Sequence, residues 1–301
     1  MPSDFLSIND LTNAELRKLV KLAVAYKASR DGAHPLAGKS VAMLFEKPSL
    51  RTKVSFDIAV YELGGNAIYL SKDEIGLDTR ESVEDVAAVL ERWASIIVAR
   101  VNDHSTLTRL AARSAIPVVN ALSDVEHPCQ AVADLLTVQN HLGHLDGLKV
   151  TYVGDANNCA LSLGLAATAA GGRFAIASPP PYAFEDATLA SIAARGAEPM
   201  ATSDPVAAVT DADVVYTDAW TSMGQEAEAE VRRDAFQGYQ VNEALLKHAK
   251  PGALVMHPMP AHYGEEVPEG MLDHPQSVAY DQAENRLHAQ KTVLRLLVAG
   301  E

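Results

Sequence analysis

The chain has 301 residues, enough for two domains of ordinary size that each have a hydrophobic core. It has 21% charged and 48% hydrophobic residues and no long apolar run, which indicates a soluble globular protein and excludes a disordered or helical membrane protein. The net charge of -14 repels nucleic acid and gives no general attraction to anionic membranes. A small anionic ligand would therefore need a local basic pocket.

The first residues and the cysteines bear on the cellular compartment. The start, MPSDFLSIND, lacks the basic and apolar stretches of a secretory signal, so we expect a cytoplasmic protein. Cys129 and Cys159 are too few for a disulfide framework and too scattered for a structural zinc site. His257 and His262 have no third ligand at a recognised spacing. We expect reduced thiols, no metal and no cofactor.

Apolar periodicity predicts an amphipathic helix over Asn13–Ser29, followed by alternating strands and helices. The predicted strands are Ser40–Phe45, Ala67–Leu70, Ile96–Ala99, Ile116–Asn120, Lys149–Val153, Arg173–Ala177, Asp213–Thr217, Ala253–His257 and Ser277–Tyr280. The later predicted helices are Ser82–Trp93, Ser105–Ser114, Gln130–His141 and Gln282–Val298. This alternation predicts an α/β fold with parallel sheets covered by helices on both faces.

A polar turn over residues 144–147 marks the predicted domain boundary. We expect a first domain over residues 1–143 and a second over 144–281, each a parallel β-sheet flanked by helices, with a C-terminal helix over 282–301 that packs back on the first domain. Ligands of parallel α/β sheets bind at the carboxyl ends of the strands. If the carboxyl ends of the strands in the two sheets face one another, we expect an active-site cleft between the domains.

The segment FEKPSLRTKVSF, residues 45–56, lies where a predicted strand ends and a helix begins. Unpaired backbone N–H groups and the positive end of the helix dipole meet there, and Arg51 adds a fork of donors shaped for phosphate. This pattern predicts a site for a small dianion. Taken alone, Ser49 before a helix is more typical of an ordinary N-cap beside a solvated Arg51.

Four further motifs follow predicted strands. Arg100 closes a strand, and the imidazole of His127 with the amide of Gln130 could polarise a carbonyl and hold an adjacent amine. The turn VGDANN, residues 153–158, lacks the glycines of a nucleotide-binding turn and suits a zwitterionic ligand. The motif DAWTSMG, residues 218–224, offers a carboxylate and a hydroxyl but no arginine, which disfavours a dicarboxylate ligand.

Together these motifs resemble those of the aspartate and ornithine carbamoyltransferases, over about Asp4 to Leu297. Within that family, residues 218–224 match in full the Asp-x-Trp-x-Ser-Met-Gly motif of the ornithine branch. The resemblance implies transfer of a carbamoyl group from carbamoyl phosphate to the side-chain amine of ornithine, giving citrulline and phosphate. An acceptor such as aspartate, putrescine or an N-modified ornithine, and a non-catalytic ligand-binding paralogue, remain as alternatives.

The resemblance also implies a role for each matched residue. The implied carbamoyl phosphate site comprises Ser49, Leu50, Arg51, Thr52, Arg100, His127, Gln130, Pro258, Met259 and Arg286. The implied ornithine site comprises Asn158, Asp218, Ser222 and Met223. The implied catalytic residues are Arg51, Arg100, His127 and Asp218.

Three residues depart from the family pattern. Leu50 replaces a threonine but keeps its backbone N–H. Lys53 replaces an arginine, so that a single ammonium charge stands in place of the forked donors of a guanidinium group. Pro258 stands where ornithine enzymes carry a cysteine, whose thiol it cannot replace, although its carbonyl remains.

The resemblance finally implies a homotrimer, or a multiple of trimers, with shared active sites. The polar loop Ser71–Arg80 is expected to reach the neighbouring active site, with Lys72 and Glu74 as candidates. No nucleic acid or membrane partner is expected.

Overall fold

The computed structural model describes residues 2–29, 33–222 and 224–299. The chain divides into two compact units, one of Met1–Leu136 with Asn285–Glu301 and the other of Thr137–Glu284. Helices α6 (Pro128–Leu142) and α12 (Ala279–Ala299) each run from one unit into the other. Among the described residues, no helix is long and apolar enough to cross a membrane.

The first unit contains a four-stranded sheet in the order β2-β1-β3-β4. Its strands are β1 (Ser40–Phe45), β2 (Asn66–Ser71), β3 (Ile96–Arg100) and β4 (Val118–Leu122). All three pairs are parallel, with Val41 of β1 opposite Ala67 and Ile96. β1 and β3 are buried almost throughout, as expected for central strands covered on both faces.

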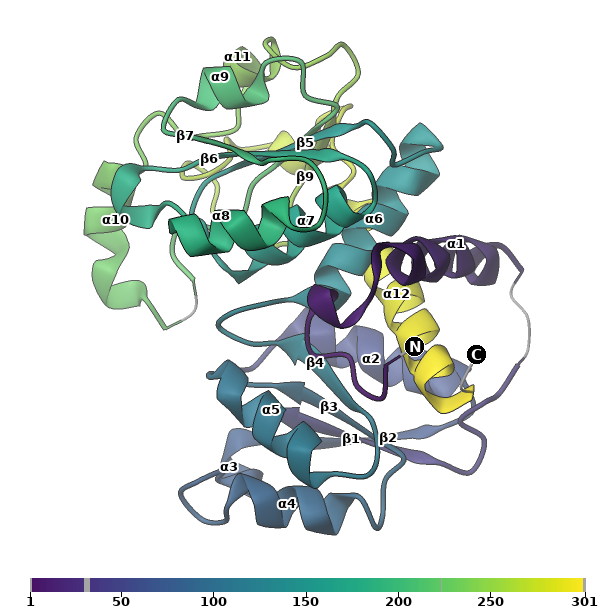
Figure 1. Ribbon diagram of the computed structural model, residues 1–301. Helices are drawn as coiled ribbons and strands as arrows, with labels where there is room; N and C mark the ends of the chain where they lie inside the picture. Colours follow the sequence, from purple (N-terminus) through teal and green to yellow (C-terminus); the bar gives the residue numbers. More distant parts are fainter. Residues whose placement is uncertain (1, 30–32, 223, 300–301) are drawn as a thin grey trace. The chain divides into compact units, whose positions relative to one another are not determined.

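Helices cover both faces of this sheet (Figure 1). α4 (Val83–Leu90) and α5 (His104–Arg113) pack against β1 and β3 in one apolar cluster. α1 (Asn13–Ser29), α2 (Leu50–Glu62) and α12 group on the other side, where the Arg295 guanidinium lies 4.0 Å from the centre of the Tyr26 ring. Two short helices, η1 (Ile8–Asp10) and α3 (Lys72–Ile75), complete the unit.

The second unit contains a five-stranded parallel sheet in the order β7-β6-β5-β8-β9. Its strands are β5 (Lys149–Val153), β6 (Arg173–Ala177), β7 (Met200–Thr202), β8 (Val214–Tyr216) and β9 (Leu254–Met256). In Figure 1, α7 (Asn158–Ala169) and α8 (Asp186–Ala193) cover one face, and α9 (Pro205–Val209) and α11 (Glu243–Leu246) the other. The remaining elements are η2 (Pro180–Tyr182), η3 (Glu226–Glu228), α10 (Ala229–Ala235) and η4 (Met271–Asp273).

The prediction of an α/β fold with two parallel sheets flanked by helices is confirmed. The prediction of a strand over Ser277–Tyr280 is wrong, because Ser277 forms only an isolated bridge with Val255 and α12 already begins at Ala279. The loop Ser71–Arg80 contains α3, whose capping box joins Ser71 to Glu74. The three-residue edge strand β7 was not predicted.

Candidate functional site

The segment of residues 45–56, in which the sequence predicts an anion site, lies at the carboxyl end of β1, where α2 begins. Ser49 is the N-cap of α2: its Oγ accepts a hydrogen bond from the Thr52 backbone N–H at 3.3 Å and donates to Thr52 Oγ1 at 3.0 Å. In the first turn of a helix, the N–H groups that are not capped have no partner within the helix. Arg51 is half-buried beside this turn, whereas the Leu50 side chain is exposed. The predicted start of a helix after Ser49 is therefore confirmed, and the anion site there stays a prediction.

A buried hydrogen-bond network in the first unit joins three residues that are far apart in sequence. Arg286 donates from Nη1 to Gln130 Oε1 and from Nη2 to Thr52 Oγ1, each at 2.6 Å. Thr52 and Gln130 are each 1% exposed and Arg286 is 4% exposed. Gln130 donates in turn to Asp134 Oδ1 at 2.8 Å. The network fixes the Gln130 amide, and its oxygen retains a second lone pair for a ligand N–H.

His127 and Arg100 add a neutral donor and a cation to the same unit. The pKa of His127 lies well below its usual value because of burial, and the charges of Arg286 and Arg100 lower it further. The imidazole is therefore neutral near pH 7, and one ring N–H can donate to an oxygen. Arg100 is buried at the carboxyl end of β3. Two buried guanidinium groups beside a neutral imidazole favour an anionic ligand.

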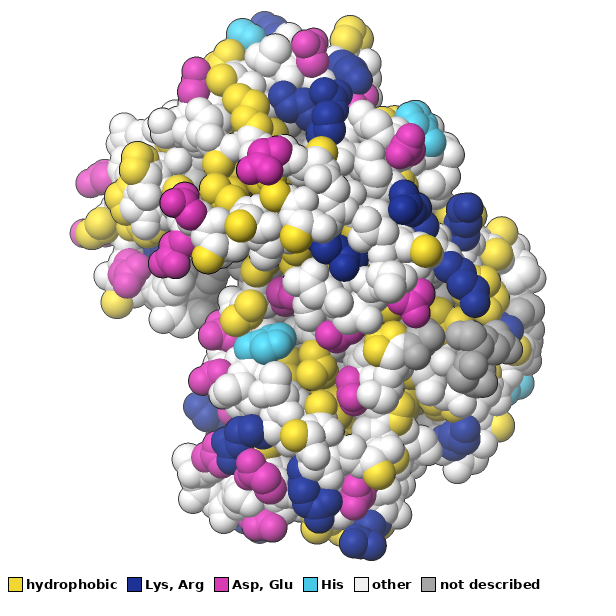
Figure 2. Space-filling view, viewed as in Figure 1, with side chains coloured by type: hydrophobic (Ala, Val, Ile, Leu, Met, Phe, Trp, Pro, Cys, Tyr) yellow, Lys and Arg dark blue, Asp and Glu magenta, His cyan; other side chains and the backbone are white. Residues whose placement is uncertain are grey.

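The guanidinium groups of this region that belong to Arg100 and Arg286 are buried. Figure 2 shows basic and acidic side chains interspersed on the face in view, in keeping with the net charge of -14. Cys129 is also not a reactive group, because burial raises the pKa of its thiol to about 12. Its Sγ lies 3.5 Å from the Asn120 carbonyl oxygen. The cations that a dianion would meet here are the buried Arg100 and Arg286 and the half-buried Arg51.

In the second unit, Asn157 orients the carboxylate of Asp218. Asn157 is the N-cap of α7, and its Oδ1 accepts hydrogen bonds from the N–H groups of Cys159 and Ala160, both at 3.0 Å. Its Nδ2 donates to Asp218 Oδ2 at 3.2 Å. Asn158, the residue that the sequence analysis selected, lies next to it at the first position of α7. Sequence reasoning missed Asn157, although an Asn before a helix is a typical N-cap.

The loop after β8 carries the predicted amino-acid site. Asp218 is half-buried, and its Oδ1 accepts a hydrogen bond from the Ala219 N–H at 2.8 Å. Ser222 is half-buried and its N–H donates to Gln225 Oε1 at 3.1 Å. Met223, also predicted to bind ornithine, lies outside the described residues. Asp218 thus keeps free acceptor capacity on a fixed carboxylate.

The turn after β9 is held by His257. Nδ1 of His257 accepts a hydrogen bond from the Met259 N–H at 2.8 Å, so the proton is on Nε2, which lies 3.0 Å from Glu266 Oε1. The His257 N–H donates to Gln282 Oε1 at 2.8 Å. These contacts fix the backbone around Pro258, which is buried. They also use both ring nitrogens of His257, which leaves neither for a metal.

Another group of possible ligands lies nearby in sequence. His262, Glu265 and Glu266 bring atoms able to bind a cation within 4.8 Å of one another. Both carboxylates already have protein partners: Arg233 Nε lies 3.0 Å from Glu265 Oε1, and the His262 N–H donates to Glu266 Oε1 at 2.6 Å. The sequence analysis considered His262 only together with His257. A cation at these three residues would therefore compete with the protein partners of both carboxylates.

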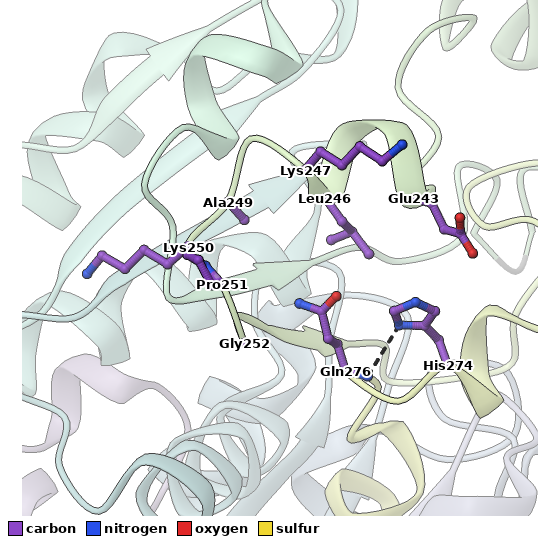
Figure 3. Close-up of a pocket in the computed structure, with 9 residues that line it drawn as sticks. All are labelled: Glu243, Leu246, Lys247, Ala249, Lys250, Pro251, Gly252, His274 and Gln276. Carbon is purple, nitrogen blue, oxygen red and sulfur yellow. Dashed lines mark hydrogen bonds between the residues drawn. The ribbon is translucent and has the colours of Figure 1, made fainter.

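A cavity of about 400 Å³ lies elsewhere in the second unit (Figure 3). It is lined by Glu243, Leu246, Lys247, Ala249, Lys250, Pro251, Gly252, His274 and Gln276. Residues 250–252 precede β9, so the cavity adjoins the amino end of that strand. Asp218 and Asn158 instead follow the carboxyl ends of β8 and β5. None of the described residues that the sequence predicts for the site lines this cavity.

Comparison with known proteins gives a consistent result over nearly the whole chain. A family model described as the carbamoyl-P binding domain of aspartate/ornithine carbamoyltransferase matches residues 3–140. A second, described as the Asp/Orn binding domain of the same family, matches residues 146–297. Ornithine carbamoyltransferase of Thermococcus kodakarensis is 46% identical to the chain over 304 residues, covering 99% of this chain and 96% of that protein.

Solved structures agree with the sequence comparisons. The ornithine carbamoyltransferase from Pyrococcus furiosus superimposes with a TM-score of 0.93 at 46% identity, covering 99% of this chain and 97% of that one. The enzyme of the same name from Thermus thermophilus gives a TM-score of 0.92 at 43% identity, with 99% of each chain covered. The chain therefore belongs to the aspartate/ornithine carbamoyltransferase family.

Proposed function

We propose that this protein transfers the carbamoyl group of carbamoyl phosphate to the side-chain amine of L-ornithine, giving L-citrulline and phosphate. The observation that carries the choice of acceptor is the complete motif at residues 218–224, in which Asn157 holds the carboxylate of Asp218 at 3.2 Å. A fixed carboxylate suits the α-ammonium group of an amino acid. Identities of 46% to proteins named ornithine carbamoyltransferase support the same acceptor.

The phosphate of carbamoyl phosphate binds at the start of α2 in this proposal. Backbone N–H groups of the first turn, with the side chains of Ser49, Arg51 and Thr52, stabilise the dianionic leaving group. Leu50 contributes its backbone N–H, which the side-chain change leaves intact. Arg286 binds Thr52 and Gln130 in the structure, and it adds positive charge to the same cluster.

The carbamoyl group lies beside His127, Arg100 and Gln130. Attack on the carbonyl carbon places negative charge on its oxygen, and the neutral imidazole and the guanidinium of Arg100 stabilise that oxyanion. Gln130 Oε1 accepts a hydrogen bond from the carbamoyl amine. The family resemblance assigns the carbonyl of Pro258, with Met259, to the same group. The new C–N bond forms first and gives the tetrahedral oxyanion; the C–O bond to phosphate then breaks, its electron pair leaves with phosphate, and the proton lost by the attacking amine passes to the departing phosphate.

Ornithine attacks through its neutral side-chain amine, because an ammonium group has no lone pair. Asp218 pairs with the α-ammonium group, and Asn158 and Ser222, with Met223 of the same motif, bind the amino-acid end. Holding that end turns the attack into an oriented step within the complex. Residues 1–143 with the C-terminal helix 282–301 serve carbamoyl phosphate, and residues 144–281 serve ornithine.

Another acceptor, such as aspartate, putrescine or an N-modified ornithine, is the alternative, and Pro258 is the observation behind it. A family cysteine that handles the ornithine amine is replaced here by a residue without a polar side chain. Asp218 argues the other way, because putrescine has no α-ammonium group and acetylation removes that charge. The acceptor is therefore set by Asp218 in this proposal.

A panel of acceptors tests the proposed function. Purified protein with carbamoyl phosphate should form citrulline from ornithine and give little product with aspartate, putrescine or Nα-acetylornithine. Product with one of those acceptors and none with ornithine would overturn the choice of acceptor. Binding of carbamoyl phosphate without turnover of any acceptor would instead indicate a non-catalytic protein.

We also propose a homotrimer, or a multiple of trimers, whose active sites share residues. An apolar stripe on α2 supports an interface between copies: Leu50 and Tyr61 are 74% and 78% exposed, and Val54 and Ile58 lie between them at helical spacing. The loop Ser71–Arg80 would reach a neighbouring site, with Lys72 or Glu74 as the contributing residue. Sedimentation should give a mass of three chains or a multiple; a monomer would contradict the proposal.

A cytoplasmic location is the last part of the proposal. Neither Cys129 nor Cys159 is in a disulfide and both are buried, which suits a reducing compartment.

A further inference from the structure

Arg232, on α10, contacts both amino-acid motifs of the second unit without belonging to either motif. Its side chain is 7% exposed, whereas that of the neighbouring Arg233 is 52% exposed. Nη1 of Arg232 donates to Asp155 Oδ2 and to the carbonyl oxygen of Trp220, both at 3.0 Å. Nε donates to Glu228 Oε2 at 3.2 Å. One guanidinium thus binds three separate groups.

Two of these groups belong to the loops that carry the proposed ornithine contacts. Asp155 is in the turn between β5 and α7, two residues before Asn157, and the Asn157 N–H donates to the Asp155 carbonyl oxygen at 2.7 Å. Trp220 lies two residues after Asp218 and two before Ser222. Arg232 therefore bridges the turn that holds Asn157 and Asn158 to the loop that holds Asp218 and Ser222.

Aromatic packing holds the bridge in place. The guanidinium carbon of Arg232 lies 4.6 Å from the centre of the Tyr182 ring, a cation–π geometry. The carbonyl oxygen of Tyr182 accepts a hydrogen bond at 3.0 Å from the N–H of Ala156, which belongs to the turn between β5 and α7. Phe236 lies between the rings of Tyr182 and Trp220, at centroid distances of 5.0 and 5.5 Å. The two loops are thus linked through both polar and aromatic contacts.

We infer that Arg232 is a positioning residue for the amino-acid half of the site, one that sets the place of Asp218 relative to Asn157 and Asn158 by tying their two loops together. This inference rests on the proposed function. Nη1 of Arg232 alone joins Asp155 to Trp220, while Nε binds Glu228. A lysine nitrogen is one bond nearer to Cα than Nη1 and cannot occupy both positions, so lysine should weaken the bridge. Burial raises the pKa of Asp155 and the charge of Arg232 lowers it, so the carboxylate depends on this partner.

The substitution Arg232→Lys tests the inference, with Arg233→Lys as the matched control. Arg233 is on the same helix and pairs with Glu265 at an exposed site. For Arg232→Lys we expect KM for ornithine to rise about 10- to 100-fold, because small displacements of a substrate-holding group have effects of that size. The Kd of carbamoyl phosphate should stay within about threefold of wild type, because most of its proposed contacts are in the first unit. Arg233→Lys should change neither constant.

Binding of L-norvaline, which is ornithine without its side-chain amine, gives a readout separate from turnover. Calorimetry with saturating carbamoyl phosphate should show weaker norvaline binding for Arg232→Lys and unchanged binding for Arg233→Lys. A loss of thermal stability with normal norvaline affinity would indicate a purely structural role and overturn the inference. Equal losses for carbamoyl phosphate and norvaline would overturn it as well.

A second variant, Asp155→Asn, removes the charge of the partner and keeps its shape. It should raise KM for ornithine selectively, and the double variant should be less impaired than the product of the two single effects predicts. If neither single variant folds, the pair is a folding element and the positioning role is wrong. Wild-type protein without citrulline formation would reject the proposed function, whereas an active wild type with unimpaired Arg232→Lys would reject only this inference.

Discussion

The two halves of the site are built differently. In the first unit, Thr52, Gln130 and Arg286 bind one another directly and are buried, so the groups proposed to bind carbamoyl phosphate support each other. In the second unit, Asp218 and Ser222 are half-buried on a loop, and other residues hold that loop in place. In the proposed function, this difference means that the groups assigned to carbamoyl phosphate are preorganised, and that the acceptor is selected by a loop that neighbouring residues support.

The largest effect is expected from breaking the buried network of the first unit. Arg286→Met removes the donors to Gln130 and Thr52, and kcat/KM should fall by about 10²- to 10³-fold, the usual size for a lost preorganised donor. Steady-state kinetics with both substrates would measure it. Arg295→Met, on the same helix beside Tyr26, is the matched control and should retain activity. Equal kinetics for the two variants would show that the network has no catalytic part.

A smaller effect is expected from loosening the second half. Asn157→Ala removes the hydrogen bond to Asp218 and should raise KM for ornithine by about tenfold, because a hydrogen bond to a charged group contributes roughly 1.5–3 kcal/mol. Asn242→Ala is the control, since Asn242 also caps a helix of the same unit, α11, at some cost in stability. If both variants lose ornithine affinity equally, loss of a helix cap explains the effect.

Pro258 offers a still smaller test on the turn after β9. Pro258→Cys keeps the carbonyl that the proposal assigns to the carbamoyl amine, so KM for carbamoyl phosphate should change by less than about threefold. The pH profile of kcat should shift if a thiol at this position handles the ornithine amine. An unchanged profile would mean that the thiol has no part in this protein. A large loss of carbamoyl phosphate affinity would contradict the role given to the carbonyl.

The smallest effect concerns stability and pH. The folded protein holds His127 neutral because its pKa is lowered well below the usual 6.5. Below about pH 6.5 the unfolded chain therefore binds roughly one proton that the folded chain does not. The free energy of unfolding consequently decreases as the pH is lowered. In His127→Asn this contribution is absent, so the melting temperature should depend less steeply on pH between about 6.5 and 5. If the melting temperatures of the two proteins changed equally steeply with pH, a neutral His127 would be contradicted.

The sequence predicts the local parts of the site and misses the long-range ones. The start of α2 follows from Ser49 and the spacing after β1, which are neighbours in the chain. The partners of Arg286 at positions 52 and 130, and those of Arg232 at 155 and 220, depend on the packing of the fold. The predicted strand at Ser277–Tyr280 failed because a short apolar run fits either a strand or the approach to a helix.

Selectivity for the α-amino group of the acceptor tests the central claim most directly. We predict that wild type favours ornithine over Nα-acetylornithine by about 10³-fold or more in kcat/KM, since a site built for a polar partner rejects an analogue that lacks it. In Asp218→Asn the preference should shrink to within about tenfold, with KM for carbamoyl phosphate nearly unchanged. A preference for the acetylated acceptor in wild type, or a full preference for ornithine in Asp218→Asn, would contradict the account.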